Sequence, residues 1–302
     1  MSAINFSTST AVFPWQPAAW LQITGADAAV FLQGQFTNEL RGIAPGQAVY
    51  GLWLTIKGKV LADSFVVRGV GESEFWVGSY FSAAAALRER LEAFVIADDV
   101  VIEDRTGEWQ GLSIVGAGAA EWLARAPAGV VAFPGRRSRG GSVEWLVPAA
   151  AWDDARARVS SLPETDAAAL ERLRIAESIA AVPRDIGQAD LPNEAGLEVE
   201  AISYTKGCYL GQEVMARLKS MGQVRRRLVR VEGEPAAGAI PAVPAPLFVG
   251  PKQAGELRSV AARPEGGWVG LAMISLLTVG AERALSFAAD GAREVRITDS
   301  LA

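Results

Sequence analysis

Residues 205–222 read TKGCYLGQEVMARLKSMG and contain Cys208, the only cysteine of the chain. Apolar residues recur every three or four positions after Gly211, which predicts a helix that begins near Gln212. The positive end of that helix and the neighbouring Lys206 favour a thiolate at Cys208. A lone cysteine also serves as a small buried hydrophobe under a helix, so both interpretations stay open at this point.

The composition excludes several classes of function. The chain has 302 residues, a net charge of −5 and a pI near 5.1, which argues for about two domains and against binding to nucleic acid or an anionic membrane. Histidine is absent, and one thiolate cannot close a zinc or iron–sulfur site, so we expect no histidine-based catalysis and no resident metal. We find no signal peptide and no long apolar run, and therefore expect a cytoplasmic protein without a membrane segment.

The pattern of the chain predicts an α+β protein with two domains. In the first, two strands meet at a turn at Lys57-Gly58-Lys59, and two amphipathic helices begin at the expected caps Ser82 and Thr165. After Gly222 the sequence becomes strand-like and rich in Pro and Gly. We therefore expect an α+β domain over residues 1–222 and a small barrel-like β domain over residues 223–302.

Four further segments carry a family resemblance beside the cysteine motif. Residues 206–213, KGCYLGQE, resemble the K-G-C-Y-x-G-Q-E signature of the YgfZ-type folate-binding family, which is related to the glycine-cleavage T-protein, an aminomethyltransferase. Residues 24–40, TGADAAVFLQGQFTNEL, resemble the N-terminal segment of that family, and KGKV at 57–60 lies where the family has K-G-K. LPNEAGLE at 191–198 and GELRSVA at 255–261 extend the resemblance over nearly the whole chain.

The resemblance implies both a fold and a function. It implies interleaved N-terminal α/β subdomains around a central channel, followed by a C-terminal antiparallel β-barrel, with tetrahydrofolate or a one-carbon-substituted folate bound in the channel. It further implies a role in iron–sulfur cluster assembly or repair, and so indirectly in tRNA modification, with iron–sulfur client or assembly proteins as partners. A non-enzymatic maturation factor is the favoured form. The alternative is a folate-dependent aminomethyl or one-carbon transferase of the T-protein type.

The resemblance also suggests roles for individual residues. Cys208 is the expected functional thiol, polarised by Lys206. The candidate folate contacts are Asp63, Glu177, Glu194, Tyr209, Gln212 and Glu213. The family carries Glu-Ala-Gly after Arg-Ile on the helix before the signature, whereas Glu177 is displaced by one position, about 100° around a helix. The T-protein also carries an Asp-Asp pair, of which Asp63 alone remains here.

These departures support a third hypothesis, a binding module that has lost folate and docks a partner through its surface. Arg225, Arg226, Arg227 and Arg230 lie close together in one predicted strand and would then face RNA. At this acidic pI, a solvated strand with ion pairs is the simpler interpretation of these arginines.

Overall fold

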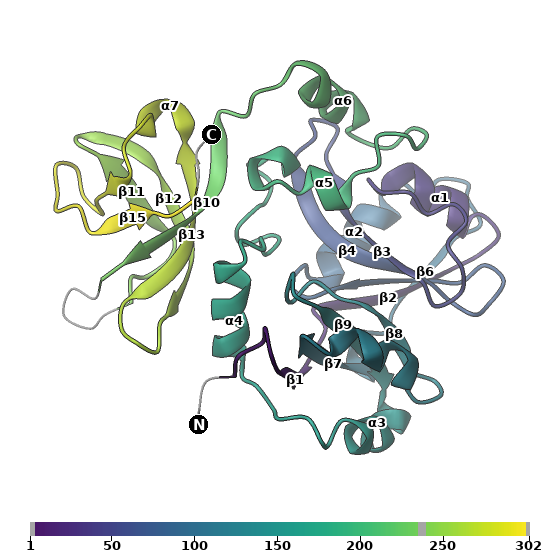
Figure 1. The fold of residues 1–302 in the computed structure, drawn as a ribbon. Coiled ribbons are helices and arrows are strands. Elements are labelled where there is room, and N and C mark those ends of the chain that lie inside the picture. The colour runs from purple at the N-terminus through teal and green to yellow at the C-terminus, as the bar shows by residue number, and fades with distance from the viewer. Residues whose placement is uncertain (1–3, 235–239, 300–302) are drawn as a thin grey trace.

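A computed structural model describes residues 4–234 and 240–299 of the chain. Figure 1 shows a mixed α/β part, coloured purple to teal, and an antiparallel β-barrel, coloured green to yellow, with α4 (Ala167–Ala176) standing between them. The expected α+β architecture with a C-terminal barrel is confirmed. The other described helices are α1 (Ala28–Gln35), α2 (Ala84–Glu92), α3 (Trp152–Arg158), α5 (Glu198–Ala201), α6 (Gln212–Met221) and α7 (Leu276–Val279).

The mixed part contains two antiparallel sheets. The larger sheet has the order β3-β4-β5-β2-β6, and the smaller has the order β1-β7-β9-β8. The strands of the larger sheet are β2 (Ala19–Thr24), β3 (Ala48–Leu54), β4 (Val60–Arg68), β5 (Phe75–Ser79) and β6 (Val101–Asp104). The strands of the smaller sheet are β1 (Thr10–Trp15), β7 (Trp109–Gly116), β8 (Val131–Pro134) and β9 (Ser142–Pro148). The expected turn at Lys57-Gly58-Lys59 joins β3 to β4.

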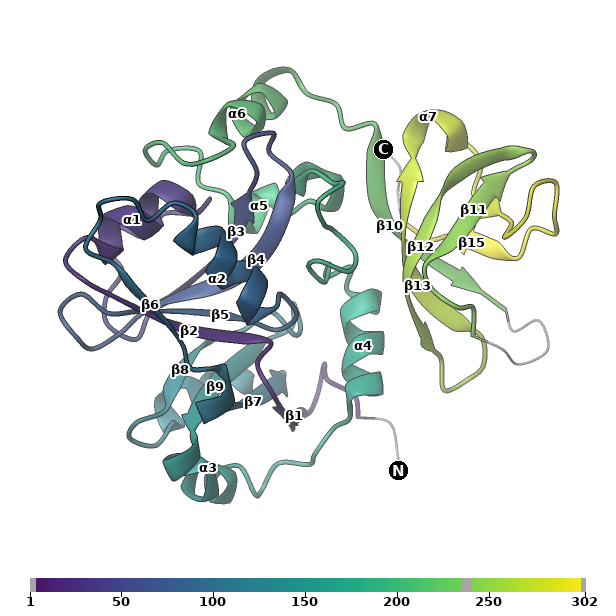
Figure 2. The ribbon, with the colours of Figure 1, turned by 180° about the vertical axis from the view of Figure 1, so that it is seen from behind.

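Alternation along β3 shows how the larger sheet separates two cores. Leu52 and Leu54 pack into a core that includes the segment after α4, whereas Trp53 packs with the apolar residues of α1 and α2 on the opposite face. This follows from the two-residue period of a strand, in which successive side chains point to opposite faces. Both faces of the sheet are therefore covered, and Figure 2 shows α1 and α2 together on one side of it.

The C-terminal strands form a barrel that is nearly closed. Their order is β11-β12-β13-β10-β15-β14, with antiparallel pairing throughout. The bounds are β10 (Arg226–Gly233), β11 (Ala245–Val249), β12 (Lys252–Ala262), β13 (Trp268–Ser275), β14 (Ala284–Leu285) and β15 (Val295–Ile297). Phe248 and Ser286 exchange two backbone hydrogen bonds of 2.9 and 3.1 Å, which join the two edges of the sheet. The edges are thus paired with each other.

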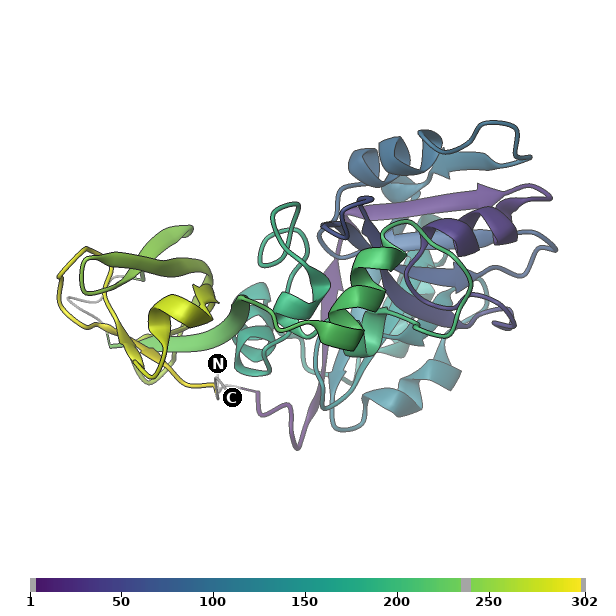
Figure 3. The same cartoon turned by 90° about the horizontal axis from the view of Figure 1, so that it is seen from above.

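Buried ion pairs join the barrel to the mixed part. The guanidinium of Arg174, on α4, donates to Asp185 Oδ2 at 2.5 Å and to Ser259 Oγ on β12 at 2.9 Å. Arg258, also on β12, donates to Asp190 Oδ2 at 2.6 Å. The side chain of Asp185 is fully buried, so these contacts replace its hydration. Figure 3 shows, from above, the segment after α4 lying between the two parts.

Both predicted helix N-caps are wrong. The N-cap of α4 is Asp166, whose Oδ1 accepts the N–H of Ala169 at 2.7 Å, and not Thr165. The helix α2 begins after Ala83 and has no side-chain cap. The Ser82 hydroxyl instead donates to the buried carboxylate of Asp63 at 2.7 Å. A buried charge that needs donors competes successfully for this hydroxyl.

Candidate functional site

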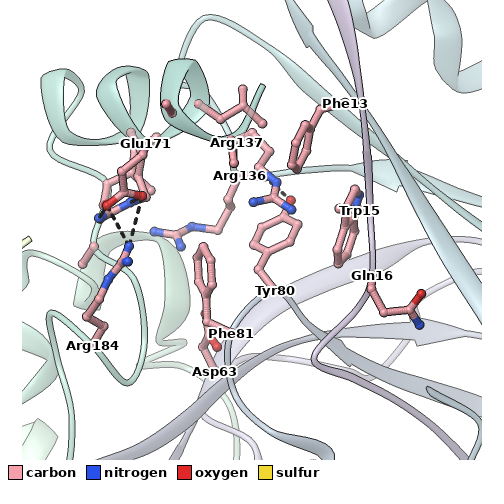
Figure 4. Close-up of a pocket in the computed structure, with 16 residues that line it drawn as sticks. Phe13, Trp15, Gln16, Asp63, Tyr80, Phe81, Arg136, Arg137, Glu171 and Arg184 are labelled. Carbon is pink, nitrogen blue, oxygen red and sulfur yellow. Dashed lines mark hydrogen bonds and ion pairs between the residues drawn. The ribbon is translucent and has the colours of Figure 1, made fainter. Parts of the chain in front are cut away.

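A cavity of about 460 Å³ lies between α4 and the two sheets of the mixed part. Figure 4 shows the Glu171–Arg184 pair on one side of it and Phe13 and Trp15 of β1 on the other. Its lining comprises Phe13, Trp15, Gln16, Asp63, Tyr80, Phe81, Arg136, Arg137, Ala167, Ala168, Leu170, Glu171, Arg174, Ile179, Ala180 and Arg184. The walls therefore combine aromatic surface with a few charged groups, which is typical of a small-molecule site.

Asp63 is the one predicted folate contact among the residues that line this cavity. Its carboxylate accepts hydrogen bonds from Ser79 Oγ at 2.8 Å, Ser82 Oγ at 2.7 Å and Tyr50 Oη at 3.1 Å. Burial raises the pKa of Asp63, and the two serine hydroxyls oppose that rise. Three donors occupy part of the capacity of a carboxylate, which has about four acceptor positions. One position is left for a ligand.

Two consecutive arginines of the β8–β9 loop, Arg136 and Arg137, also line the cavity. The Arg136 guanidinium lies 4.0 Å from the ring centroid of Tyr50 and pairs with Glu200, yet its buried Nε has no hydrogen-bond partner in the described structure. The Arg137 guanidinium lies 3.9 Å from the ring centroid of Tyr80. A buried donor without a hydrogen-bond partner lowers the stability of the fold. A ligand atom that accepts from the Nε of Arg136 would remove this cost.

Sequence reasoning missed these arginines. They lie in FPGRRSRGGS, residues 133–142, which the pattern identifies only as a loop. The signal that could have drawn attention to them was the run of arginines between glycines. Glycine-rich loops let a backbone approach a ligand closely, and arginines recognise carboxylates.

Glu177 and Glu194 lie outside the lining of the cavity, as far as the described residues go. The Glu177 carboxylate accepts from Ser138 Oγ at 3.0 Å and from the backbone N–H of Arg139, so it faces the β8–β9 loop. The Glu194 carboxylate is buried and accepts from Arg226 Nε at 3.0 Å. Both carboxylates thus have protein partners, and their contact with folate stays a prediction.

Cys208 is exposed, in the loop between α5 and α6. The predicted helix start is confirmed, because α6 begins at Gln212 directly after Gly211, which has a φ of +89°. Gln212 is half-buried and Glu213 is exposed in the first turn of that helix. The exposed thiol favours the interpretation of Cys208 as an accessible group over that of a buried hydrophobe.

Lys206 is turned away from solvent toward the end of α1. Its Nζ donates to the carbonyl oxygens of Gln33 at 2.7 Å, Phe36 at 2.5 Å and Asn38 at 3.0 Å. Burial lowers its pKa to about 8. Tyr209 is buried beside it, with its ring centroid 5.2 Å from Nζ and its hydroxyl without a partner in the described structure. All three N–H donors of the ammonium are thus committed to backbone carbonyls.

Two of the arginines considered for RNA recognition have internal partners. Arg226 pairs with Asp190 and Glu194, and Arg230 donates to the carbonyl oxygen of Ala176 at 2.5 Å. These contacts favour the simpler interpretation, a strand held by ion pairs. None of the described helices has the length and apolar character needed to cross a membrane. Among the described residues, no cluster of three or more potential metal ligands is found.

Comparisons with known proteins agree on one group of relatives. A family model described as the GCVT N-terminal domain matches residues 5–134. The human protein named "Iron-sulfur cluster assembly factor IBA57, mitochondrial" is 32% identical over 230 residues, which cover 70% of this chain and 63% of the human protein. The "tRNA-modifying protein YgfZ" of Vibrio vulnificus (strain YJ016) is 28% identical over 227 residues, covering 72% of this chain and 69% of that protein.

The fold has a counterpart among solved structures. The glycine cleavage system aminomethyltransferase T from Bartonella henselae superposes with a TM-score of 0.77 and 18% sequence identity, covering 98% of this chain and 86% of that one. At this identity the likeness shows the fold alone. The alignment with the human protein spans less than two thirds of that protein's length.

Proposed function

Because the chain belongs to the YgfZ-type family of relatives of the glycine-cleavage T-protein, we propose that it binds tetrahydrofolate and acts in iron–sulfur cluster assembly or repair, and so indirectly in tRNA modification. The folate, or a one-carbon-substituted form of it, occupies the cavity beside Asp63. Cys208 is the functional thiol. Iron–sulfur client or assembly proteins are the partners.

The observation that carries the folate proposal is the chemistry of the cavity walls. A reduced folate has a pterin with a polar edge, a second aromatic ring and an anionic glutamate tail. The cavity offers a buried carboxylate at Asp63, aromatic surface at Trp15 and Tyr80, and arginines on the β8–β9 loop. Its volume of about 460 Å³ lies within the usual range for ligand sites, roughly 300–1,000 Å³. The unpartnered buried Nε of Arg136 adds a donor that a polar ligand atom satisfies.

The exposure of Cys208 supports a role in handling a cluster that belongs to another protein. Iron–sulfur clusters are held by several thiolates, so the single cysteine of this chain needs further ligands from a partner. A thiol in an exposed loop is accessible to such a partner, whereas a thiol in a core is not. At Gly211, three residues after Cys208, the chain approaches the β3–β4 turn closely, which anchors the end of this loop.

A transferase of the T-protein type is the alternative, and the raised pKa of Asp63 favours it. A carboxyl whose pKa is raised by burial is better suited to accept and return a proton than an ordinary aspartate is. Under this alternative Asp63 is the acid–base group beside the folate. Formation of methylenetetrahydrofolate from an aminomethyl donor separates it from a maturation factor without turnover.

Calorimetric titration with tetrahydrofolate under reducing conditions tests the proposal. We expect saturable binding to the wild type and to Cys208→Ala, and binding weakened at least about tenfold by Asp63→Asn, which removes a buried charge facing the ligand. Asp153→Asn, an exposed carboxylate on α3, is the matched control and should bind like the wild type. Absence of binding to the wild type would remove folate from the proposal.

A further inference from the structure

Arg137 differs from the other arginines of the cavity because it forms no ion pair with the described residues. Its guanidinium is held by stacking, with its central carbon 3.9 Å from the ring centroid of Tyr80 and 4.8 Å from that of Trp15. Its Nε donates to Ser113 Oγ at 3.2 Å. These contacts fix the orientation of the fork while leaving its charge without a direct counterion.

The neighbouring arginines already have carboxylate partners. Arg136 pairs with Glu200, and Arg184 donates to both carboxylate oxygens of Glu171, at 2.8 and 3.0 Å. Arg174 is shared between Glu171 and the buried Asp185. In Figure 4 the Glu171–Arg184 pair lies on one side of the cavity and the β1 aromatics on the other.

A buried carboxylate, Glu144, lies behind the Arg137 wall but is already satisfied. It accepts from Ser113 Oγ at 2.5 Å, Tyr80 Oη at 2.7 Å and Ser142 Oγ at 3.0 Å. Burial raises the pKa of Glu144, while the charge of Arg137 lowers it. Glu144 therefore orients the Tyr80 ring and the Ser113 hydroxyl, both of which contact Arg137. The other N–H donors of the Arg137 guanidinium stay available for a ligand.

Glu177 holds the loop that carries Arg137. Its carboxylate accepts from Ser138 Oγ at 3.0 Å and from the Arg139 N–H, and its carbonyl oxygen accepts from Arg139 Nε at 2.9 Å. Three contacts thus tie the two residues that follow Arg137 to the end of α4. A displacement of these contacts would move the Arg137 guanidinium relative to the other residues that line the cavity.

We propose that Arg137 binds the carboxylate tail of the cavity's ligand, and that Glu177 is a positioning residue that sets the place of Arg137 by clasping the β8–β9 loop. The inference rests on the proposed function only in taking the ligand to be a folate. On this proposal, the Arg137 end of the cavity selects aromatic compounds that carry a carboxylate. It also gives the displaced glutamate a task that does not require contact with the pterin.

Three probes separate this inference from the proposed function. Tetrahydrofolate carries both ends of the ligand, 6-methyltetrahydropterin carries the pterin alone, and p-aminobenzoyl-glutamate carries the tail alone. Each is titrated calorimetrically into the wild type, Arg137→Ala, Arg137→Lys and Glu177→Gln. Arg125→Ala removes an exposed arginine that does not line the cavity and is the matched control. Thermal unfolding of each variant establishes that it is folded.

We expect Arg137→Ala to weaken tetrahydrofolate and p-aminobenzoyl-glutamate roughly tenfold or more while leaving 6-methyltetrahydropterin within twofold of wild type. Arg137→Lys should recover part of the loss, because it keeps the charge without the fork. Glu177→Gln should show the same selective loss in smaller measure, which a general loss of stability would not produce.

Equal binding of p-aminobenzoyl-glutamate to the wild type and Arg137→Ala, or no binding of it to the wild type, would overturn the inference. That outcome leaves the folate proposal standing if tetrahydrofolate still binds through Asp63. Conversely, tail-dependent binding without any binding of 6-methyltetrahydropterin supports the carboxylate site and counts against the pterin site. A Glu177→Gln variant that weakens all three probes alike would mark Glu177 as structural only.

Discussion

A side chain at Gly211 would place its Cβ 2.7 Å from the carbonyl oxygen of Thr55. The contact is reciprocal, since a Cβ at Gly58 would meet the side chains of Val214 and Met215 at 2.9 Å. The turn between β3 and β4 and the start of α6 therefore touch through glycines on both sides. This close approach fixes the loop of Cys208 against the larger sheet.

Gly211→Ala is expected to destabilise the protein and displace the thiol loop. The substitution forces a Cβ into a backbone with a φ of +89° and against Thr55, at a combined cost of about 2–4 kcal/mol. Gly129→Ala is the matched control, because its φ is +81° and nothing lies within 4 Å of its Cβ. It should cost about 1 kcal/mol. Urea unfolding measures both, and equal losses would contradict a steric role for Gly211.

Cys208 is expected to react with iodoacetamide in the folded protein. The thiol is exposed, so labelling should proceed at a rate comparable to that in urea, with one label per chain. Cys208→Ser should change the free energy of unfolding by less than about 0.5 kcal/mol, as is usual for exposed positions. Mass spectrometry follows the labelling. Reaction only after unfolding would show that the thiol is buried in solution.

The free energy of unfolding should rise with pH above about 8, because Lys206 loses its buried charge there. Burial lowers its pKa from 10.5 to about 8 in the folded chain, so between these values the unfolded chain holds more protons. Stability then rises with pH, by up to about 1.4 kcal/mol per unit. The gain should be absent from Lys206→Met. The unfolding free energies of both proteins between pH 7 and 9.5 provide the comparison, and parallel profiles would contradict the prediction.

Glu194→Gln should cost stability, and its effect on folate affinity tests the predicted contact of Glu194 with folate. Its buried carboxylate accepts from Leu191 N at 2.7 Å and pairs with Arg226, which keeps Asp190 as a second partner. We expect a loss of about 1–2 kcal/mol. Glu164→Gln breaks an exposed ion pair and should change stability by less than about 0.5 kcal/mol. Weaker tetrahydrofolate binding at unchanged stability would instead make Glu194 a ligand contact.

Local pattern predicted much of the fold. The apolar spacing after Gly211 located the start of α6 correctly, and the lysine–glycine–lysine turn was found between two strands. The caps were less predictable. Thr165 and Asp166 are both suitable cap residues, and Ser82 is recruited by Asp63, a residue on a different element. Such competition between a helix end and a distant buried charge cannot be seen in a local pattern.

The site was harder to predict than the fold. Lys206 is two residues from Cys208, yet its ammonium lies on carbonyls at the end of α1, because three acceptors there satisfy a buried charge. Arg136 and Arg137 read as an ordinary loop, since the segments that enclose them are far apart in sequence. Proximity along the chain therefore predicted the segments of the candidate site well. It predicted poorly which side chains contact one another.

The residues that line the cavity are far apart in the sequence, and this has a consequence during synthesis. The lining runs from Phe13 on β1 to Arg184 beyond α4, so the pocket is incomplete until both ends of that span have been made. Translation releases the N-terminal strands first. During this time the aromatic side chains of β1 and of the segment after β5 lack the rest of the cavity. Ligand binding in the cavity therefore requires that synthesis has passed Arg184.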